Sequence, residues 1–467
     1  MRRHANRFES LSLSLALLVA PGFLPAQASS SQEPQAATKE GGKNDEILID
    51  WLKKNAIPIK SVEAGNGFAD LQPLKRILSD ARVVGLGEAT HGTREFFQFK
   101  HRMVEFLVRE MNFNVFAIEA NYSGCLKVND YVTGGKVSRA EALKNLGFLV
   151  WKTEEVAALV DWLRAYNQTV PPERKVRFYG FDMQNMEAYD ALQEYLLRVA
   201  PEKTREITDT FNKFRAAKQA AYGGAREGLK ALLPEVDKLI RYFVLQEANF
   251  IHKTSRAEYE INLHLLRLLF QDADISSREF NESFEPRDRY MAENFLHLLN
   301  REPAGTRVAV WAHNSHISTG EIPGPDGALG KWMGNYLRQE LNGGYYALGF
   351  VFNEGSFQAT STTSSGETQF VEYTVGPAGE GSLNWYFAQP KIGNYIIDFR
   401  RTPKNEAVQQ WLTKPRGLGF LGGYNIPQDY KDWWAAGGKT FQWVTLSKEF
   451  DGMIFIERTT RARPLSR

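Results

Sequence analysis

The sequence predicts an α/β protein with a largely parallel β-sheet flanked by helices, and with an α-helical insertion. Short runs of β-branched and aromatic residues recur along the chain. Amphipathic segments such as "TREFFQFKHRMVEFLVREM" and "TEEVAALVDWLRAYN" separate several of these runs. Strands that alternate with helices are typical of a parallel sheet covered on both faces. A chain of 467 residues with 43% hydrophobic content is long enough to bury a sizeable core.

The first 28 residues are predicted to be a secretory signal peptide. Three arginines precede the apolar run "LSLSLALLVA", and small residues at Ala26 and Ala28 form an A-x-A cleavage pattern. The run is too short to span a membrane comfortably. We therefore expect an exported protein, periplasmic or secreted. The polar residues 29–45 are predicted to be a flexible linker, and residues 46–460 a single catalytic domain.

The net charge limits the partners that we expect, and the cysteine count limits the disulfides. The chain has 57 basic and 55 acidic residues, and cleavage after residue 28 would remove three arginines and one glutamate. A neutral mature chain gives no basic field for nucleic acid, or for a membrane beyond the export step. The single cysteine, Cys125, rules out an intramolecular disulfide, and its apolar surroundings predict a buried thiol.

Seven runs are predicted to be strands, and one long block to be helical. Between residues 201 and 300 the chain is rich in helical patterns such as "YEINLHLLRLLFQDA", which predict the insertion. The predicted strands are "ARVVGLG", "NVFAIEA", "VRFYGFD", "TRVAVWAH", "YYALGFVFNEG", "NYIIDFR" and "GMIFIE".

Carboxylates and histidines follow the ends of four of these predicted strands. Because the carboxyl ends of parallel strands share one edge of a sheet, where α/β proteins build their sites, we expect these side chains to surround one cleft. Each also has a structural interpretation, since acids are common at strand ends and at helix N-termini. The residues are Glu88 and His91, Glu119, Asp182, and His313 with His316.

Several familiar catalytic motifs are missing. The chain has no G-x-S-x-G nucleophile elbow and no H-E-x-x-H zinc helix. "GLGEAT" begins like a dinucleotide fingerprint, but Thr90 stands where the third glycine belongs. "GALGKW" lacks the spacing and the hydroxyl residue of a P-loop.

The segments "GLGEATHGTREFFQFKHRM", "FNVFAIEAN", "FYGFDMQ", "RDRYMAENF" and "VWAHNSHIS" resemble the erythromycin esterase family, from about Val83 to the C-terminus. Members hydrolyse the lactone ester of macrolide antibiotics, so the resemblance implies an ester or macrolactone hydrolase and a role in macrolide resistance. It also implies that His91 activates water, with Glu88 beside it. The family is related to haem-binding ChaN-like proteins and to metalloproteases with a similar turn.

The resemblance also indicates residues around the substrate, a small-molecule ester or lactone. Family members often carry arginine where Lys100 stands here, and Arg102 lies two residues further on. A lysine keeps the charge but loses bidentate geometry. The candidate substrate-binding residues are Glu119, Lys100, Arg102, Asp182 and Arg287.

The residue types fit ester hydrolysis by direct attack of water, which needs a base, a carboxylate that orients it, and donors for the oxyanion. His91 is the candidate base and Glu88 its partner, and His313 or His316 is the candidate oxyanion donor. No cofactor is expected on this interpretation. Two alternatives remain open. One is a metal-dependent hydrolase or peptidase that uses the same cluster, in which imidazoles and Glu88 or Glu119 hold Zn²⁺; the other is a protein that binds haem or a small ligand.

Overall fold

The structure is a computed structural model that describes residues 41–184, 189–323, 329–362, 368–401, 405–419, 426, 428–437 and 442–465. The predicted signal peptide, and the linker up to residue 40, lie outside the described residues. In the part of the chain that the structure describes, we find no helix with the length and apolar character needed to span a membrane.

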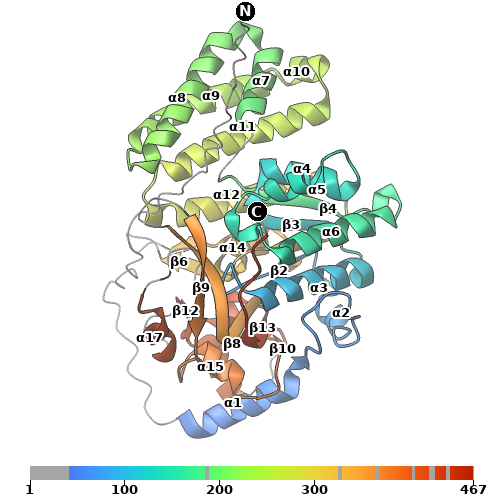
Figure 1. Cartoon of the computed structure of the whole chain (residues 1–467), viewed down its shortest axis with the longest axis vertical. Helices are drawn as coiled ribbons and strands as arrows, with labels where there is room; N and C mark the ends of the chain where they lie inside the picture. Colours follow the sequence, from blue (N-terminus) through green and yellow to red (C-terminus); the bar gives the residue numbers. More distant parts are fainter. Residues whose placement is uncertain are drawn as a thin grey trace, which may run out of the picture.

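A nine-stranded sheet forms the centre of the molecule (Figure 1). Its spatial order is β1-β10-β13-β8-β2-β5-β3-β4, and β9 pairs with β8. The five pairings from β13 across to β4 are all parallel, whereas β1, β10 and β9 join antiparallel. The strands are β1 (Ile57–Pro58), β2 (Val83–Leu86), β3 (Val115–Asn121), β4 (Arg177–Asp182), β5 (Val308–Trp311), β8 (Tyr345–Thr362), β9 (Thr368–Val375), β10 (Tyr395–Asp398) and β13 (Gly452–Thr459).

All seven predicted runs form strands of this sheet. Every residue of β2, β3 and β5 is buried, which is why these strands appear as continuous apolar runs rather than as alternating ones. The prediction of a largely parallel sheet flanked by helices is confirmed. The antiparallel direction of β10 could not be predicted from its sequence, because direction depends on how the connecting segments cross the sheet.

Helices cover both faces of the sheet, and each face has its own cluster of buried hydrophobic residues. On one face lie α3 (Arg94–Met111), α4 (Tyr122–Thr133), α5 (Arg139–Lys144) and α6 (Glu154–Gln168). On the other lie α12 (Phe284–Arg301), α14 (Met333–Glu340), α15 (Leu383–Ala388) and α16 (Glu406–Thr413). From β2 the chain passes to β3 and β4, returns to place β5 between β2 and β3, and then adds β8, β10 and β13 on the other side of β2.

The predicted insertion is a helical bundle that stands at one end of the molecule (Figure 1). The helix that ends at Arg301, α12, does not belong to it: it packs against β4 and α14, so the bundle ends at Ser276 rather than near residue 300. The bundle helices are α7 (Tyr189–Val199), α8 (Thr204–Tyr222), α9 (Glu227–Leu245), α10 (Glu247–Lys253) and α11 (Arg256–Ser276).

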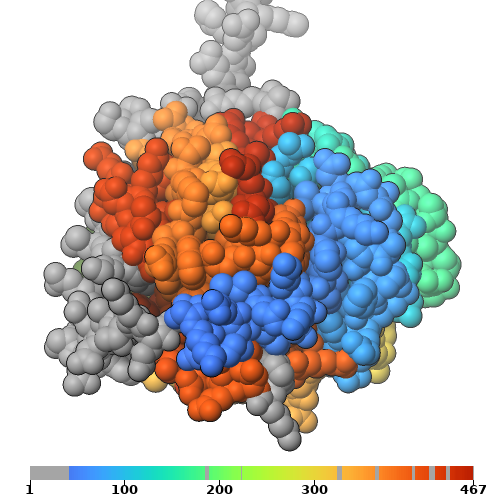
Figure 2. Space-filling model, turned by 90° about the horizontal axis from the view of Figure 1, so that it is seen from below, coloured from blue at the N-terminus to red at the C-terminus, as the bar shows by residue number. Residues whose placement is uncertain are grey.

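The N-terminal helix α1 (Gly41–Asn55) corrects part of the predicted linker, because residues 41–45 are helical. Its buried side chains Leu48, Trp51 and Leu52 pack toward α15 and α16. The helix lies at the lower end of the molecule in Figure 1, and its outer surface is part of the blue area seen from below in Figure 2. The remaining short elements are α2 (Leu74–Ile77), α13 (Asn314–Ile317), α17 (Tyr430–Ala435), α18 (Leu446–Glu449), β6 (Glu321–Pro323), β7 (Leu329–Lys331), β11 (Arg416–Leu418) and β12 (Gln442–Val444).

Candidate functional site

The turn between β2 and α3 lies pressed against β8. A β-carbon on Gly92 would lie 1.9 Å from the backbone oxygen of Gln358, and the Gln358 amide donates to the Gly92 oxygen at 3.0 Å. A β-carbon on Gly87 would lie 2.2 Å from Oδ1 of Asn314. These glycines therefore allow close packing of the turn, which fixes the direction of the Glu88 and His91 side chains between them.

Glu88 lies at the centre of a buried polar group and is itself fully buried. Its Oε1 accepts from His91 Nδ1 at 2.6 Å, and its Oε2 accepts from Lys100 Nζ at 2.6 Å and from Trp311 Nε1 at 3.0 Å. Burial lowers the pKa of Lys100 to about 8, although the neighbouring Glu88 opposes this shift. Both carboxylate oxygens are thus held by fixed donors.

His91 is oriented by this carboxylate. With Nδ1–H donated to Glu88, the neutral ring carries its free lone pair on Nε2. The ring lies edge-on to Trp151 at 5.5 Å and 5.0 Å from the ring of His313, measured between centroids. Its side chain is 12% exposed, whereas Glu88 is not exposed at all. His91 is therefore the member of the pair that a substrate can reach.

His313 begins α13 directly after β5. Its backbone amide donates to Glu119 Oε2 at 3.0 Å, and its Nδ1 accepts from the amide of Ser315 at 3.2 Å. Burial, together with the neighbouring His91 and His316, holds the pKa of His313 well below its ordinary value. We conclude that His313 is a neutral ring that separates the Glu88–His91 pair from a second charged group.

That second group joins three carboxylates to two cations. Arg287 Nη2 donates to Glu119 Oε1 at 2.9 Å and also to Asp182, to which Nε donates at 3.2 Å. His316 Nδ1 lies 2.9 Å from Asp288 Oδ1, and its Nε2 lies 3.3 Å from Glu119 Oε1. The group is assembled from β3, β4, α12 and α13.

Charge balance explains this arrangement. Burial would lower the pKa of His316, but Asp288 and Glu119 outweigh it and raise that pKa to about 10. Burial likewise would raise the pKa of Glu119, yet His316 and Arg287 hold it well below its ordinary value. The nearest nitrogens of Arg287 and His316 are only 3.0 Å apart. This distance allows a hydrogen bond between them, and the three surrounding carboxylates balance the positive charge gathered here.

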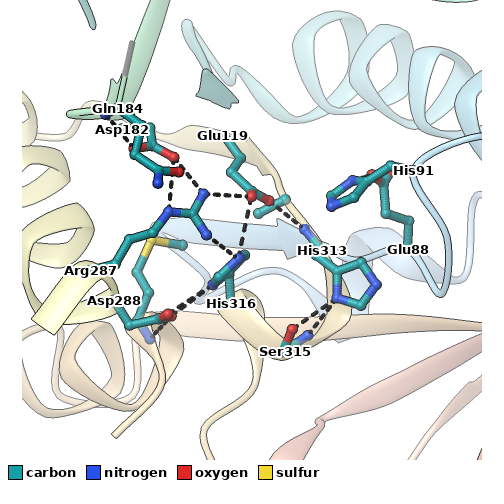
Figure 3. Close-up of polar contacts among 12 residues, drawn as sticks. Glu88, His91, Glu119, Asp182, Gln184, Arg287, Asp288, His313, Ser315 and His316 are labelled. Carbon is teal, nitrogen blue, oxygen red and sulfur yellow. Dashed lines mark hydrogen bonds and ion pairs between the residues drawn. The ribbon is translucent and has the colours of Figure 1, made fainter. Parts of the chain in front are cut away.

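The structure places all but one of the candidate residues close together, in a largely buried group rather than around an open cleft. His91 lies beside His313, which lies beside Glu119 and the Arg287 group (Figure 3). Arg102 lies elsewhere: its guanidinium binds Asp70 and the backbone oxygens of Ser61 and Gly67. Residues two apart on an α-helix point about 200° apart around its axis, so Lys100 and Arg102 cannot both face the site. The expectation that Arg102 contacts substrate is not supported by this position.

Other residues at this site were not predicted. Trp311 donates to Glu88, and Trp151 packs on His91 and donates from Nε1 to the backbone oxygen of Glu119 at 2.8 Å. Asp288 follows Arg287 in the segment "RDRYMAENF", but its role as the partner of His316 was not predicted. Trp151 gives no sequence signal, because it lies in a single 3₁₀ turn (Leu149–Trp151) between helices.

Access to the site is limited in this conformation. Arg287, with its side chain 14% exposed, and His91 are its most exposed members. A cavity of about 590 Å³, lined in part by Trp385, Lys391 and Glu457, contains none of the site residues. Among the described residues, no three His, Cys, Asp or Glu side chains are arranged to hold a metal ion.

Comparison with known proteins gives a family and a fold. The family model described as erythromycin esterase matches residues 108–459. A Bacillus subtilis protein named as a hydrolase, YbfO, is 25% identical over 448 residues, which cover 91% of this chain and 94% of that protein. Erythromycin esterase type II of Escherichia coli is 26% identical over 385 residues, covering 76% of this chain and 90% of that protein.

A solved structure from Bacillus cereus superposes with a TM-score of 0.75 at 23% identity. It covers 90% of this chain, and this chain covers 99% of it. At this identity the likeness supports the fold alone, including the arrangement of the sheet that carries the site.

Proposed function

The chain belongs to the erythromycin esterase family of hydrolases, and from this premise we propose that it cleaves a carboxylic ester or macrolactone with water activated by His91. The observation that carries this proposal is the Glu88–His91 pair, with 2.6 Å between Oε1 and Nδ1. A buried carboxylate that fixes one nitrogen of a partly exposed imidazole leaves the other nitrogen available as a general base.

In the proposed reaction, His91 Nε2 takes a proton from water as the water oxygen bonds to the ester carbonyl carbon. Glu88 stabilises the imidazolium that forms, and Lys100 and Trp311 hold Glu88 in place. The tetrahedral intermediate then expels the alkoxide, which receives the proton from His91. The products are a carboxylic acid and an alcohol, or one opened chain when the substrate is a lactone.

In the proposed reaction, Arg287 and His316 supply positive charge for the oxyanion. Of the two histidines considered as oxyanion donors, His316 has the raised pKa, about 10, and His313 the lowered one. Both ring nitrogens of His316 already face Asp288, Glu119 and Arg287, so His316 adds positive charge and Arg287 is the better candidate donor. Arg287 lies 3.0 Å from His316 and is the more exposed of the two cations. A donor of this kind contributes about 3–4 kcal/mol to transition-state stabilisation.

The donor set fits a resident metal poorly. Glu88 already contacts the ammonium of Lys100, and Glu119 already contacts the guanidinium of Arg287. A divalent cation bound by either carboxylate would lie beside a buried positive charge, which is unfavourable. We therefore propose a hydrolase that works without metal, and we expect its rate to be unchanged after treatment with a chelator.

Replacement of His91 by asparagine tests the role of the base. Loss of a general base should lower kcat by about 10²–10⁴ with little change in KM. Macrolides are the first substrates to try, since the relatives include erythromycin esterases. Mass spectrometry follows the reaction as the gain of one water by the lactone.

His252→Asn is the matched control, because this histidine lies on α10 in the bundle, away from the site. It should retain the full rate. A His91→Asn enzyme with normal kcat would show that His91 is not the base. A rate abolished by a chelator and restored by zinc would favour the metal-dependent alternative, and a Soret band in the purified protein would favour haem binding.

We also propose that the protein is exported, on the basis of the basic start, the apolar run and the "AQA" pattern. Mass spectrometry of the exported fraction from an expressing bacterium should give an N-terminus near Ser29. Retention of Met1 in that fraction would contradict cleavage.

A further inference from the structure

The six residues that follow the last strand run along the turn that carries His91. We name Thr460–Leu465 the C-terminal strap. The amide of Ala462 donates to the oxygen of Gly92 at 2.8 Å, and the amide of Arg94 donates to the oxygen of Thr460 at 2.9 Å. Ala462 is completely buried. The strap therefore holds the backbone immediately after His91 from its outer side.

The same strap also holds the segment that carries Trp151. The amide of Leu465 donates to the oxygen of Lys152 at 3.0 Å, and the amide of Glu154 donates to the oxygen of Arg463 at 2.8 Å. Two segments distant in sequence, the His91 turn and the Trp151 turn, are thus paired to one short piece of backbone. In Figure 1 this dark red segment runs upward from β13 toward the C-terminus.

The attachment of the strap to Lys152 and Glu154 matters because this segment carries Trp151. It is fully buried, its ring is edge-on to His91, and its Nε1 donates to the backbone oxygen of Glu119. Movement of the Trp151 turn would therefore change the wall against which the His91 ring rests. It would also loosen the link to the strand that positions Glu119.

Two carboxylates fix the strap at both ends. Glu95, in the first turn of α3, accepts from the amide and the hydroxyl of Thr460, both at 2.6 Å. Glu155, in the first turn of α6, accepts from the amide of Arg463 at 3.1 Å. The strap is thus attached to the N-terminal turns of both helices that follow the site loops.

We propose that the C-terminal strap is a positioning element that sets the place of the His91 ring relative to Glu88 and Trp151. It contacts neither the reacting atoms nor a substrate, and it acts through the backbone at Gly92 and Lys152. As far as it concerns rate, the proposal rests on the proposed role of His91. A displacement of about 1 Å at a catalytic group can lower a rate about 10²-fold.

Two variants test the strap. One chain ends at Thr459 and so lacks the strap, and the other carries Ala462→Pro, which removes the strap's N–H that donates to the Gly92 oxygen but leaves the bond from Gln358 in place. We expect kcat to fall about 10²-fold in both with KM nearly unchanged. The free peptide TRARPLSR should restore rate to the shortened chain. A chain lacking only residues 466–467 is the control and should keep the full rate.

A second measurement does not depend on activity. The rate at which diethyl pyrocarbonate modifies His91, followed by peptide mass mapping, should rise in both strap variants, because the ring loses its packing on Trp151. If the shortened chain does not fold, as judged by a missing cooperative thermal transition, the Ala462→Pro variant decides.

The two proposals fail in different ways. If His91→Asn keeps its full rate but the strap variants still expose His91 to modification, the general-base role is wrong and the positioning role stands. If folded Ala462→Pro protein keeps both its kcat and the wild-type modification rate of His91, the positioning role is overturned.

Discussion

Substitution of Glu88 by glutamine removes a buried charge while it keeps the shape of the side chain. Lys100 Nζ lies 2.6 Å from Glu88 Oε2, and neither side chain is exposed. Removal of one partner of a buried ion pair typically costs about 3–5 kcal/mol, because the other charge is left unpaired. We therefore expect Glu88→Gln and Lys100→Met each to lower the free energy of unfolding at pH 7 by that amount.

The double variant separates this explanation from a simple loss of packing. Lys100 Nζ lies 4.5 Å from the centroid of the Trp311 ring, so a methionine at this position would pack on an aromatic surface. Independent effects would add to about 6–10 kcal/mol. Because both substitutions remove the same pair, we expect Glu88→Gln/Lys100→Met to cost no more than either single change. Its rate should still be low, since a neutral amide stabilises the imidazolium of His91 less than the carboxylate does.

Urea unfolding followed by tryptophan fluorescence measures these differences. The exposed pair Lys75–Glu110 is the matched control, and its removal should leave the free energy of unfolding nearly unchanged, because solvent screens exposed charges. The pH dependence provides a further check on Glu88→Gln. Without the carboxylate, buried Lys100 loses its proton in the folded state but keeps it in the unfolded state below about pH 10.4. The stability of this variant should then rise with pH up to that value. Additive losses in the double variant would refute the reasoning.

Three further predictions concern packing, charge and the thiol. Gly92→Ala places a β-carbon 1.9 Å from a backbone oxygen of β8 and should abolish most activity, whereas Gly376→Ala, with no atom within 4 Å, should not; the rates of hydrolysis decide. Asp288→Asn should destabilise the protein by about 3–5 kcal/mol near pH 6. This loss should shrink as the pH rises through about 10, where His316 loses its proton in the wild type. Urea titrations over this pH range measure the loss, and a constant loss would contradict the prediction. Burial raises the pKa of Cys125, so a thiol reagent such as DTNB should react with it only after unfolding.

The sequence predicted the strands of the sheet and the polar residues at their ends, because both depend on local patterns. A run such as "FAIEAN" is apolar at nearly every position, which predicts a strand buried on both faces. This prediction does not depend on where the strand lies in the sheet. Both Lys100 and Arg102 are candidates from the sequence, although helical periodicity allows only one of them to share a face with the site; the structure showed that it is Lys100.

Tertiary structure decided how these pieces meet. Arg287 reaches Asp182 from 105 residues further along the chain, because α12 leaves the bundle and packs on β4. No local pattern encodes that contact, since it depends on where the insertion returns to the sheet. The placing of Trp151 on His91 and of the C-terminal strap along Gly92 likewise follows from the close packing of distant segments. The residue types that can do the chemistry are determined by sequence alone, whereas their pairing and charge states depend on burial, which arises only when these segments pack together.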